Sequence, residues 1–190
     1  MSLTLHPKST ALVIIDLQRA IVGRQLGPHN SKEVVSRSAE LAAAVRASGG
    51  TVAYVHVLVN EFFRLQADKP NPRPEEPMPA SASEVVEEAG FQPGDLLIAK
   101  RQWGAFYGTD LEQQLRRRGI RTIIMAGIAT NFGVESTARA AQDHGYELVF
   151  AEDAMSSLSA ELHEFSVQKL FPIMGRVRSS AEIRAALKGA

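Results

Sequence analysis

The chain has 190 residues, no cysteine, and 21 Lys and Arg residues that balance 21 Asp and Glu residues. The missing cysteine excludes disulfides, cysteine zinc sites, iron–sulfur clusters and thiol nucleophiles, and the balanced charge offers nucleic acid or anionic lipid no wide basic field. A hydrophobic content of 45% over this length favours one folded domain spanning residues 1–190. No signal-like N-terminus and no apolar run of the ~20 residues that a membrane span needs are present, so we expect a cytoplasmic protein.

Short β-branched segments alternate with longer amphipathic segments along most of the chain. In chain order we expect a strand over 10–16, a helix over 32–48 capped by Ser31, strands over 51–59 and 95–100, a helix capped by Asp110 and running to Gly119, a strand over 122–127, a helix over 131–144, a strand over 147–153, a helix over 159–171, a short strand within 175–179 and a closing helix over 180–188. This alternation predicts βαβ units and therefore an α/β fold: a three-layer α/β/α, doubly wound, mainly parallel sheet of about six strands.

The order of the strands within that sheet stays open. The orders 3-2-1-4-5-6 and 2-1-3-4-5-6 both bring the ends of the first and fourth strands to the carboxyl edge, where ligands bind in open parallel sheets. Only the second order places the third strand beside the first.

The segment 60–94 interrupts the alternation. It carries six of the 9 prolines, at positions 70, 72, 74, 77, 79 and 93, and shows no strand pattern. A loop this long inside a compact domain favours a lid over a site or an arm that contacts another subunit.

Three features lie directly after predicted strands, where a ligand site is expected. Asp16 follows the first strand, Lys100 ends the third, and small residues in the 127–137 loop expose backbone N–H groups beside a helix N-terminus. A carboxylate and an ammonium at one edge can share proton transfer and anion stabilisation. Each feature also has an ordinary alternative. Asp16 can be a turn residue or a helix cap, Lys100 can be a solvated residue at the end of a strand, and the 127–137 loop can be an ordinary tight turn between strand and helix.

Four blocks carry a resemblance to a known family: ALVIIDLQ at 11–18, KRQWGAFYGTDL at 100–111, GIATNFGVEST at 127–137 and GYELVFAEDAMSS at 145–157. In this order they resemble the isochorismatase-like (cysteine hydrolase) family. The resemblance implies a catalytic Asp at Asp16 and a catalytic Lys at Lys100. It also implies a cis peptide between Ile128 and Ala129, and it places the family's nucleophilic cysteine at Gly133.

Because position 133 is a glycine and the chain has no cysteine anywhere, the covalent amidase route is closed. The resemblance then implies the chemistry of isochorismatase itself, in which a vinyl ether is protonated on carbon, water captures the oxocarbenium ion and pyruvate leaves. Asp16 would be the general acid, and Lys100 with the backbone N–H groups of Ala129 and Gly133 would hold the anionic groups of the substrate. Because a nearby ammonium lowers the pKa of a carboxyl group, burial of Asp16 must outweigh Lys100 for this role.

Five further residues are candidates for substrate contacts. Gln18 orients Asp16 or its loop, or else begins a helix at the surface, and Asn131 and Phe132 flank the 127–137 corner. Trp103 and Phe106 follow Lys100 and are expected either to wall an apolar pocket or to pack a long loop.

A metal site and a cofactor are not expected. His56 stands alone after the second strand without an Asp-x-His pattern, and four other histidines, His6, His29, His144 and His163, show no ligand spacing. No phosphate-binding glycine motif follows the first strand, and Asp153 is interpreted as a structural residue that caps the following turn.

Three functions stay in view. The first is a cofactor-independent hydrolase of a small, carboxylated substrate, acting through Asp16 and Lys100. The second is a small-molecule-binding protein that kept the pocket but lost the thiol, and the third is a structural homo-oligomer with a vestigial pocket. Expected partners are a small-molecule substrate and further copies of the chain, with neither nucleic acid nor membrane.

Overall fold

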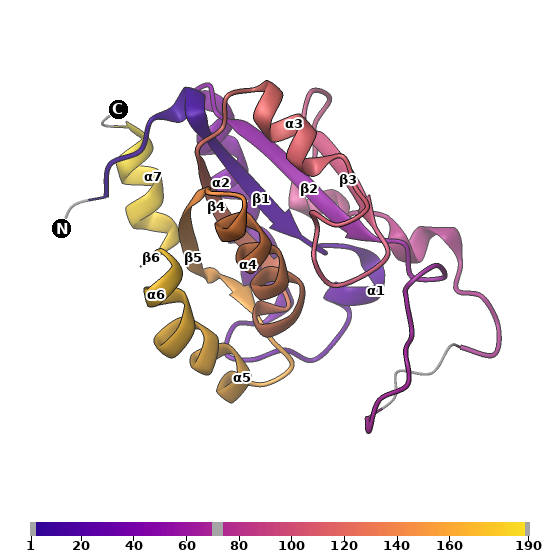
Figure 1. Ribbon diagram of the computed structural model, residues 1–190. Coiled ribbons are helices and arrows are strands. Elements are labelled where there is room, and N and C mark those ends of the chain that lie inside the picture. Colours follow the sequence, from indigo (N-terminus) through magenta and orange to yellow (C-terminus); the bar gives the residue numbers. More distant parts are fainter. Residues whose placement is uncertain (1–2, 70–73, 189–190) are drawn as a thin grey trace.

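A six-stranded sheet forms the centre of the computed structural model, which describes residues 3–69 and 74–188 (Figure 1). All neighbouring strands pair in parallel, in the order β3-β2-β1-β4-β5-β6. The strands are β1 (Thr10–Ile15), β2 (Thr51–Val57), β3 (Leu96–Lys100), β4 (Thr122–Ile128), β5 (Glu147–Ser156) and β6 (Arg176–Arg178). The predicted α/β fold is confirmed, and of the two open strand orders the structure has the one that separates β3 from β1.

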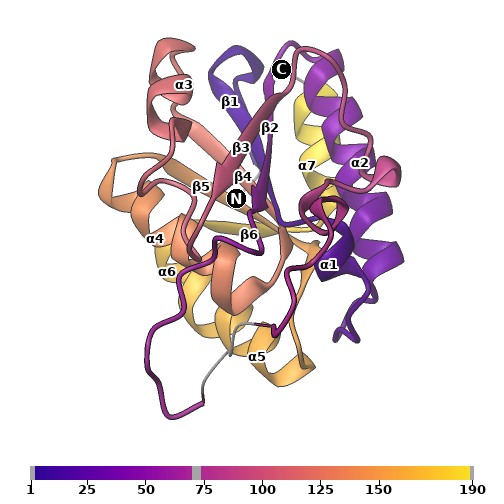
Figure 2. The same cartoon turned by 90° about the vertical axis from the view of Figure 1, so that its right-hand side faces the viewer.

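Helices cover both faces of the sheet, which gives the predicted three layers (Figure 2). They are α1 (Arg19–Val22), α2 (Ser31–Ala47), α3 (Leu111–Arg117), α4 (Glu135–Asp143), α5 (Ala160–Phe165), α6 (Phe171–Met174) and α7 (Ser180–Lys188). One apolar cluster joins α2 and α7 to the sheet through side chains such as Leu41 and Ile183, and a second joins α3 and α4 to the opposite face through Leu115 and Ala138. Because both faces are covered, β1 is buried along its whole length.

The start of α2 differs from the expectation. Asn30, not Ser31, is the N-cap: its Oδ1 accepts the backbone N–H of Glu33 at 3.1 Å, and the Glu33 carboxylate accepts the N–H of Asn30 at 2.9 Å. This reciprocal capping box satisfies two helix-end donors at once, which a Ser one residue later does not match. Asp110 does occupy the N-cap of α3, but its carboxylate accepts from Gln114 Nε2 at 2.7 Å rather than from the backbone.

Two expected helices contain wider turns. The helix predicted over 131–144 opens with a π-helical turn, Thr130–Val134, before α4, and the helix predicted over 159–171 consists of α5, the π-helical turn Ser166–Leu170 and α6. Extra residues in a helical turn are frequent at functional sites, and the first of these turns follows the carboxyl end of β4.

The segment 60–94 leaves the sheet after β2 and returns as two short 3₁₀ turns, Ala80–Ser83 and Glu87–Ala89. Asn60 closes the base of its outer part, because the side-chain amide donates to Met78 O at 2.9 Å and accepts from Met78 N at 2.9 Å. The described parts of the loop between these two residues, 61–69 and 74–77, extend from the body of the molecule (Figure 1). Pro70 and Pro72 of the predicted proline-rich stretch lie outside the described residues.

Membrane crossing by a helix was not expected. Within residues 3–69 and 74–188, every helix is too short or too polar to traverse a bilayer.

Candidate active site

Asp16 directly follows β1 in a left-handed backbone conformation, with φ of 53°. Its backbone N–H donates to Val55 O at 2.8 Å, which fixes the turn at the end of the two strands. Among the described residues it is the only non-glycine residue with positive φ. An Asp side chain tolerates this region better than most, and strained backbones of this kind gather at functional sites.

Lys100 reaches Asp16 from the end of β3, although β2 lies between β3 and β1. Its Nζ is 2.9 Å from Asp16 Oδ2 and also donates to Trp103 O at 2.7 Å, and the side chain is only 1% exposed. Since neighbouring strands lie about 4.8 Å apart, an extended lysine side chain is long enough to bridge the intervening strand. The two residues predicted for the site therefore form a buried ion pair.

Gly133 completes this group. A Cβ atom added to Gly133 would lie 3.0 Å from Lys100 Nζ, 3.3 Å from Asp16 Oδ2 and 2.9 Å from Ile15 Cγ2. Its backbone does not require the left-handed region, so the close approach of Asp16 and Lys100 is what a side chain would meet. Gly133, the position that the family resemblance assigns to a cysteine, therefore faces Asp16 and Lys100 but has no side chain of its own.

Burial raises the pKa of the Asp16 carboxyl group above its ordinary value, against the ion pair and hydrogen bond with Lys100, which lower it. His56 and Arg24 add smaller lowering effects through their charge or partial charge. Oδ1 of Asp16 is buried and has no hydrogen-bond partner among the described residues. A proton on the carboxyl group relieves the cost of holding that bare anionic oxygen away from water.

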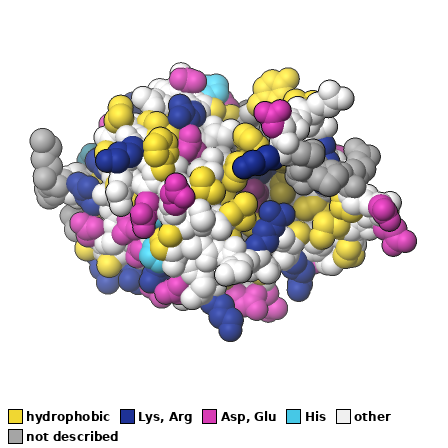
Figure 3. Space-filling model, turned by 90° about the horizontal axis from the view of Figure 1, so that it is seen from below, with side chains coloured by type: hydrophobic (Ala, Val, Ile, Leu, Met, Phe, Trp, Pro, Cys, Tyr) yellow, Lys and Arg dark blue, Asp and Glu magenta, His cyan; other side chains and the backbone are white. Residues whose placement is uncertain are grey.

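A cavity of about 450 Å³ opens above these residues. Figure 3 shows apolar and basic side chains gathered around a hollow on this side of the molecule. The cavity is lined by Asp16, Ala20, Ile21, Arg24, Val57, Val59, Phe62, Arg64, Lys69, Pro74, Met78, Lys100, Gln102, Trp103, Ile128, Ala129, Phe132, Gly133 and Leu158. The rings of Trp103 and Phe132 meet edge to face, with centroids 5.1 Å apart, and form one wall.

The outer loop of segment 60–94 contributes to this cavity, as one of the two interpretations of the proline-rich stretch predicts. Arg64, Lys69 and Pro74 of the loop line the cavity, together with Met78 at its base. The loop therefore covers the candidate site of its own chain.

Three predicted substrate contacts do not line the cavity. Gln18 is fully buried, where its amide bonds Val57 N at 2.7 Å, Val57 O at 2.9 Å and Ala82 O at 3.1 Å. Phe106 packs in the core beside the His144 and Tyr146 rings, and Asn131 accepts a hydrogen bond from the Ser157 hydroxyl. Gln18 thus joins the end of β2 to the covering segment.

Positive charge surrounds the cavity, and the sequence interpretation missed it. Arg24, Arg64 and Lys69 line the cavity in addition to Lys100, whereas Asp16 is the only acidic side chain that the described residues contribute to it. Arg64 donates to the carbonyl groups of Phe62 and Val59, each at 3.0 Å, and its Nε is buried without a partner among the described residues. Basic residues within the predicted lid were the signal that could have pointed to this feature.

The peptide between Ile128 and Ala129 is cis, as the family resemblance implies. Next to it, Thr130 Oγ1 lies 2.9 Å from Nδ1 of the buried His163. This contact joins the corner after β4 to α5.

The histidines are not all scattered in space, which corrects part of the expectation. His29, Glu152 and His163 come together with potential ligand atoms within 4.8 Å of one another. Burial lowers the pKa of His163 to about 4, and the neighbouring His29 contributes. His56 instead bonds the Ser83 carbonyl at 2.7 Å through Nδ1.

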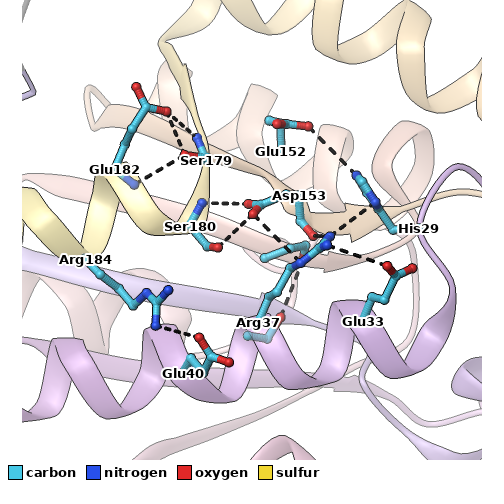
Figure 4. A network of polar contacts seen from close by, with 12 residues as sticks. His29, Glu33, Arg37, Glu40, Glu152, Asp153, Ser179, Ser180, Glu182 and Arg184 are labelled. Atoms are coloured by element: carbon cyan, nitrogen blue, oxygen red, sulfur yellow. Dashed lines mark hydrogen bonds and ion pairs between the residues drawn. The ribbon is translucent and has the colours of Figure 1, made fainter.

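Asp153 is part of the polar network in Figure 4. Its carboxylate accepts from Ser180 N at 2.6 Å and Ser180 Oγ at 2.8 Å. It thus holds the first residue of α7, rather than the turn that follows β5.

Comparisons with known proteins agree with this geometry. The isochorismatase domain matches residues 10–182. The chain is 49% identical to the isochorismatase family protein YecD of Escherichia coli O157:H7, over 97% of this chain and 100% of that protein. It is 28% identical to the ureidoacrylate amidohydrolase RutB of Agrobacterium fabrum, over 89% of this chain and 87% of that protein.

A solved structure of an isochorismatase family protein from Burkholderia thailandensis superposes with a TM-score of 0.92 at 42% identity. The superposition covers 97% of this chain and 98% of that chain.

Proposed function

The chain belongs to the isochorismatase family and is a hydrolase, and from this premise we propose that it hydrolyses a small anionic substrate without a covalent enzyme intermediate. The observation that carries the proposal is the arrangement at Gly133, where Asp16 and Lys100 face a residue without a side chain. With no cysteine in the chain, an amidase mechanism that depends on a thiol has no nucleophile.

We propose a vinyl ether as the reacting group. Protonated Asp16 donates its proton to the vinyl carbon, and the ether oxygen stabilises the resulting oxocarbenium ion. Water then adds to this cation and returns a proton to Asp16, after which the hemiketal collapses to a ketone and an alcohol. Every proton is accounted for, and no metal or cofactor takes part.

Burial and the ion pair have separate roles in this scheme. Burial raises the pKa of Asp16 and so favours the protonated acid that the first step requires. Lys100, at 2.9 Å, stabilises the Asp16 carboxylate that exists only after the proton has left. An interaction that strengthens as charge develops lowers the barrier.

The basic side chains support an anionic substrate. Lys100 Nζ is already bonded by Asp16 and Trp103 O, whereas Arg24 has no side-chain partner among the described residues, and Lys69 lies in the covering loop. A carboxylate on the substrate would be attracted to this surplus of positive charge. The ring pair of Trp103 and Phe132 provides an apolar surface for the remainder of the substrate.

The test compares wild-type protein with Asp16→Asn on a panel of small vinyl ethers, amides and carboxylates. Asparagine has the same shape and tolerates the positive φ of position 16, so a loss of turnover reports the missing acid. We expect turnover of a carboxylated vinyl ether to fall by about 10²- to 10⁴-fold in the variant. Asp110→Asn is the control, because Asp110 is exposed and bonds only Gln114.

The other outcomes separate the alternatives. Tight binding of panel compounds with no turnover by wild-type protein would instead support a binding protein that kept the pocket. Turnover of amides would contradict the vinyl-ether proposal and align the chain with relatives such as the ureidoacrylate amidohydrolase RutB.

We also propose that the chain is a single domain over residues 1–190 and a cytoplasmic homo-oligomer. Phe63 and Leu65, exposed on the covering loop, support an apolar contact with a second copy. Sedimentation equilibrium measures this directly, and a monomer at all concentrations would contradict the oligomer.

A further inference from the structure

We propose that His29, Glu152 and His163 form a binding site for a zinc-like divalent cation, separate from the catalytic cavity. The residues come from three parts of the chain: the loop before α2, strand β5 and helix α5. Their potential ligand atoms lie within 4.8 Å of one another, and none of the three lines the cavity.

His163 is already oriented as a ligand. Its side chain is almost fully buried, and Nδ1 lies 2.9 Å from the Thr130 hydroxyl oxygen. Because the hydroxyl can accept as well as donate, the contact is compatible with the tautomer that the proposal requires, in which Nδ1–H donates to the Thr130 oxygen and the lone pair is on Nε2. Histidines that bind metals are commonly held in this way by a hydrogen bond from the other ring nitrogen.

Glu152 is a carboxylate without a close partner. It is partly buried, and its nearest nitrogen partner among the described residues is His29 Nε2 at 4.0 Å. Figure 4 shows the Glu152 side chain pointing toward the His29 ring. A cation between the two residues would supply the counter-charge that the carboxylate lacks.

Arg37 opposes the cation. Its Nη1 lies 3.2 Å from His29 Nδ1 and donates to Asp153 O at 2.8 Å. Because a guanidinium only donates, Nδ1 of His29 accepts, and the imidazole proton is on Nε2 when no metal is bound. Metal binding to Nε2 requires this proton to move to Nδ1 by exchange with water, while Arg37 keeps its bond to Asp153 and leaves the ring.

The ligand set selects the class of cation. Two imidazole nitrogens and one carboxylate oxygen suit Zn²⁺ and neighbouring first-row ions, whereas Mg²⁺ and Ca²⁺ prefer oxygen ligands. Bond lengths of about 2.0–2.2 Å require the ligand atoms to draw closer than they are now. Three protein ligands leave a fourth position for water.

A bound metal would link α5 and the loop before α2 to β5 through its three ligands. His163 also contacts Thr130, the residue after Ala129 in the cavity wall, so the site adjoins the corner after β4. Its expected effect is on the stability of this corner, and no chemical step passes through the metal.

The experiment is titration calorimetry of EDTA-dialysed full-length protein with ZnCl₂ and separately with MgCl₂. We expect one Zn²⁺ per chain, weak or absent Mg²⁺ binding, and a rise in Tm with Zn²⁺. Co²⁺ in place of Zn²⁺ is expected to give the intense visible absorption of four-coordinate cobalt. Absence of Zn²⁺ binding, or binding unaccompanied by a shift in Tm, would overturn the proposal.

Variants assign the binding to these residues. Glu152→Gln and His29→Asn alter partly exposed side chains and are expected to weaken Zn²⁺ binding at least tenfold, whereas the buried His163 is left intact to preserve folding. Glu161→Gln, exposed on α5, is the matched control and should bind like wild type. Unchanged affinity in both ligand variants would mean that the metal binds elsewhere and the proposal is wrong.

Arg37→Gln tests the competition directly. Removing the guanidinium frees His29 Nδ1 to carry the proton and makes the cluster more negative, so Zn²⁺ binding should tighten. Equal or weaker binding by this variant would contradict the role given to Arg37. None of these measurements depends on catalytic activity, so they remain informative if the vinyl-ether proposal fails.

Discussion

Lys100 Nζ lies 2.9 Å from Asp16 Oδ2 although the two residues end strands that are not neighbours in the sheet. The ammonium passes over the end of β2, and its second bond, to Trp103 O, holds it there. The ion pair is therefore set by the order of the strands and by the length of one side chain. Burial of the pair raises the pKa of the Asp16 carboxyl group, against the lowering effect of Lys100.

The pH dependence of activity and stability follows from the raised pKa of Asp16. If Asp16 is the acid, kcat/KM falls as pH rises through its folded-state pKa. The unfolded chain loses this proton at lower pH than the folded chain, so the contribution to stability is full below the unfolded pKa and is lost between the two values.

Urea unfolding of wild type and Asp16→Asn across pH measures this contribution. The unfolding free energy of the wild type, relative to that of Asp16→Asn, should fall as pH rises. A constant difference at all pH values would show that the Asp16 pKa is not raised.

Lys100→Met should raise the pKa of Asp16 further, because Lys100 is the largest of the influences that lower it. The descending limb of the pH–rate profile then moves to higher pH, while the maximal rate falls because the Asp16 carboxylate formed in the reaction loses its partner. Carbon-13 NMR titration of the Asp16 carboxyl measures the pKa independently of turnover. A limb that moves to lower pH would contradict the assignment of the acid.

Gly133→Cys should produce a reactive thiol, since the added Cβ lies 3.0 Å from the Lys100 ammonium. Contact with Ile15 Cγ2 at 2.9 Å makes the variant less stable by about 1–3 kcal/mol. Iodoacetamide labelling near neutral pH tests the reactivity, and any label belongs to residue 133 because the chain has no cysteine. Gly133→Ala carries the same Cβ and isolates the cost in stability.

The labelling rate has a clear reference. Reaction no faster than that of a free thiol peptide under the same conditions would show that the corner lacks the positive potential assigned to it.

Arg24→Gln should raise KM for an anionic substrate by roughly fivefold to tenfold, the effect of about 1 kcal/mol for a solvent-screened charge. The effect on kcat should be small, because Arg24 is exposed and its charge is the smallest of the influences on the Asp16 pKa. Steady-state kinetics at low and high salt checks both statements, because high salt should reduce the difference in KM between Arg24→Gln and wild type. Arg19→Gln is the control, since Arg19 pairs with Glu84 and does not line the cavity.

The strand-end residues were predictable from the sequence because parallel strands deliver their carboxyl ends to one edge. Asp16, Lys100 and Gly133 were found in this way, with the family resemblance adding their roles. The strand order was not predictable, since either order brings the first and fourth strands to that edge, and hydrophobic runs do not identify their neighbours.

Other misplacements come from contacts between residues distant in sequence. Phe106 lies near Trp103 in the chain, yet its ring packs against Tyr146 in the core. His29 and His163 are far apart in the chain and meet only because the loop before α2 lies beside α5 in the fold. The pattern of neighbouring residues in the sequence contains no information on either contact.

The anchoring of the covering loop separates access to the cavity from the reaction. Gln18, two residues after Asp16, binds Ala82 O, and Asn60 joins Met78 at the base of the loop, so the described residues 61–69 and 74–77 lie between fixed points. Changes of length or composition between these points would reshape the entrance, while β1 and β3 keep their places in the sheet. Under the proposed mechanism, related chains can therefore diverge in substrate range through this stretch while Asp16 and Lys100 stay the same.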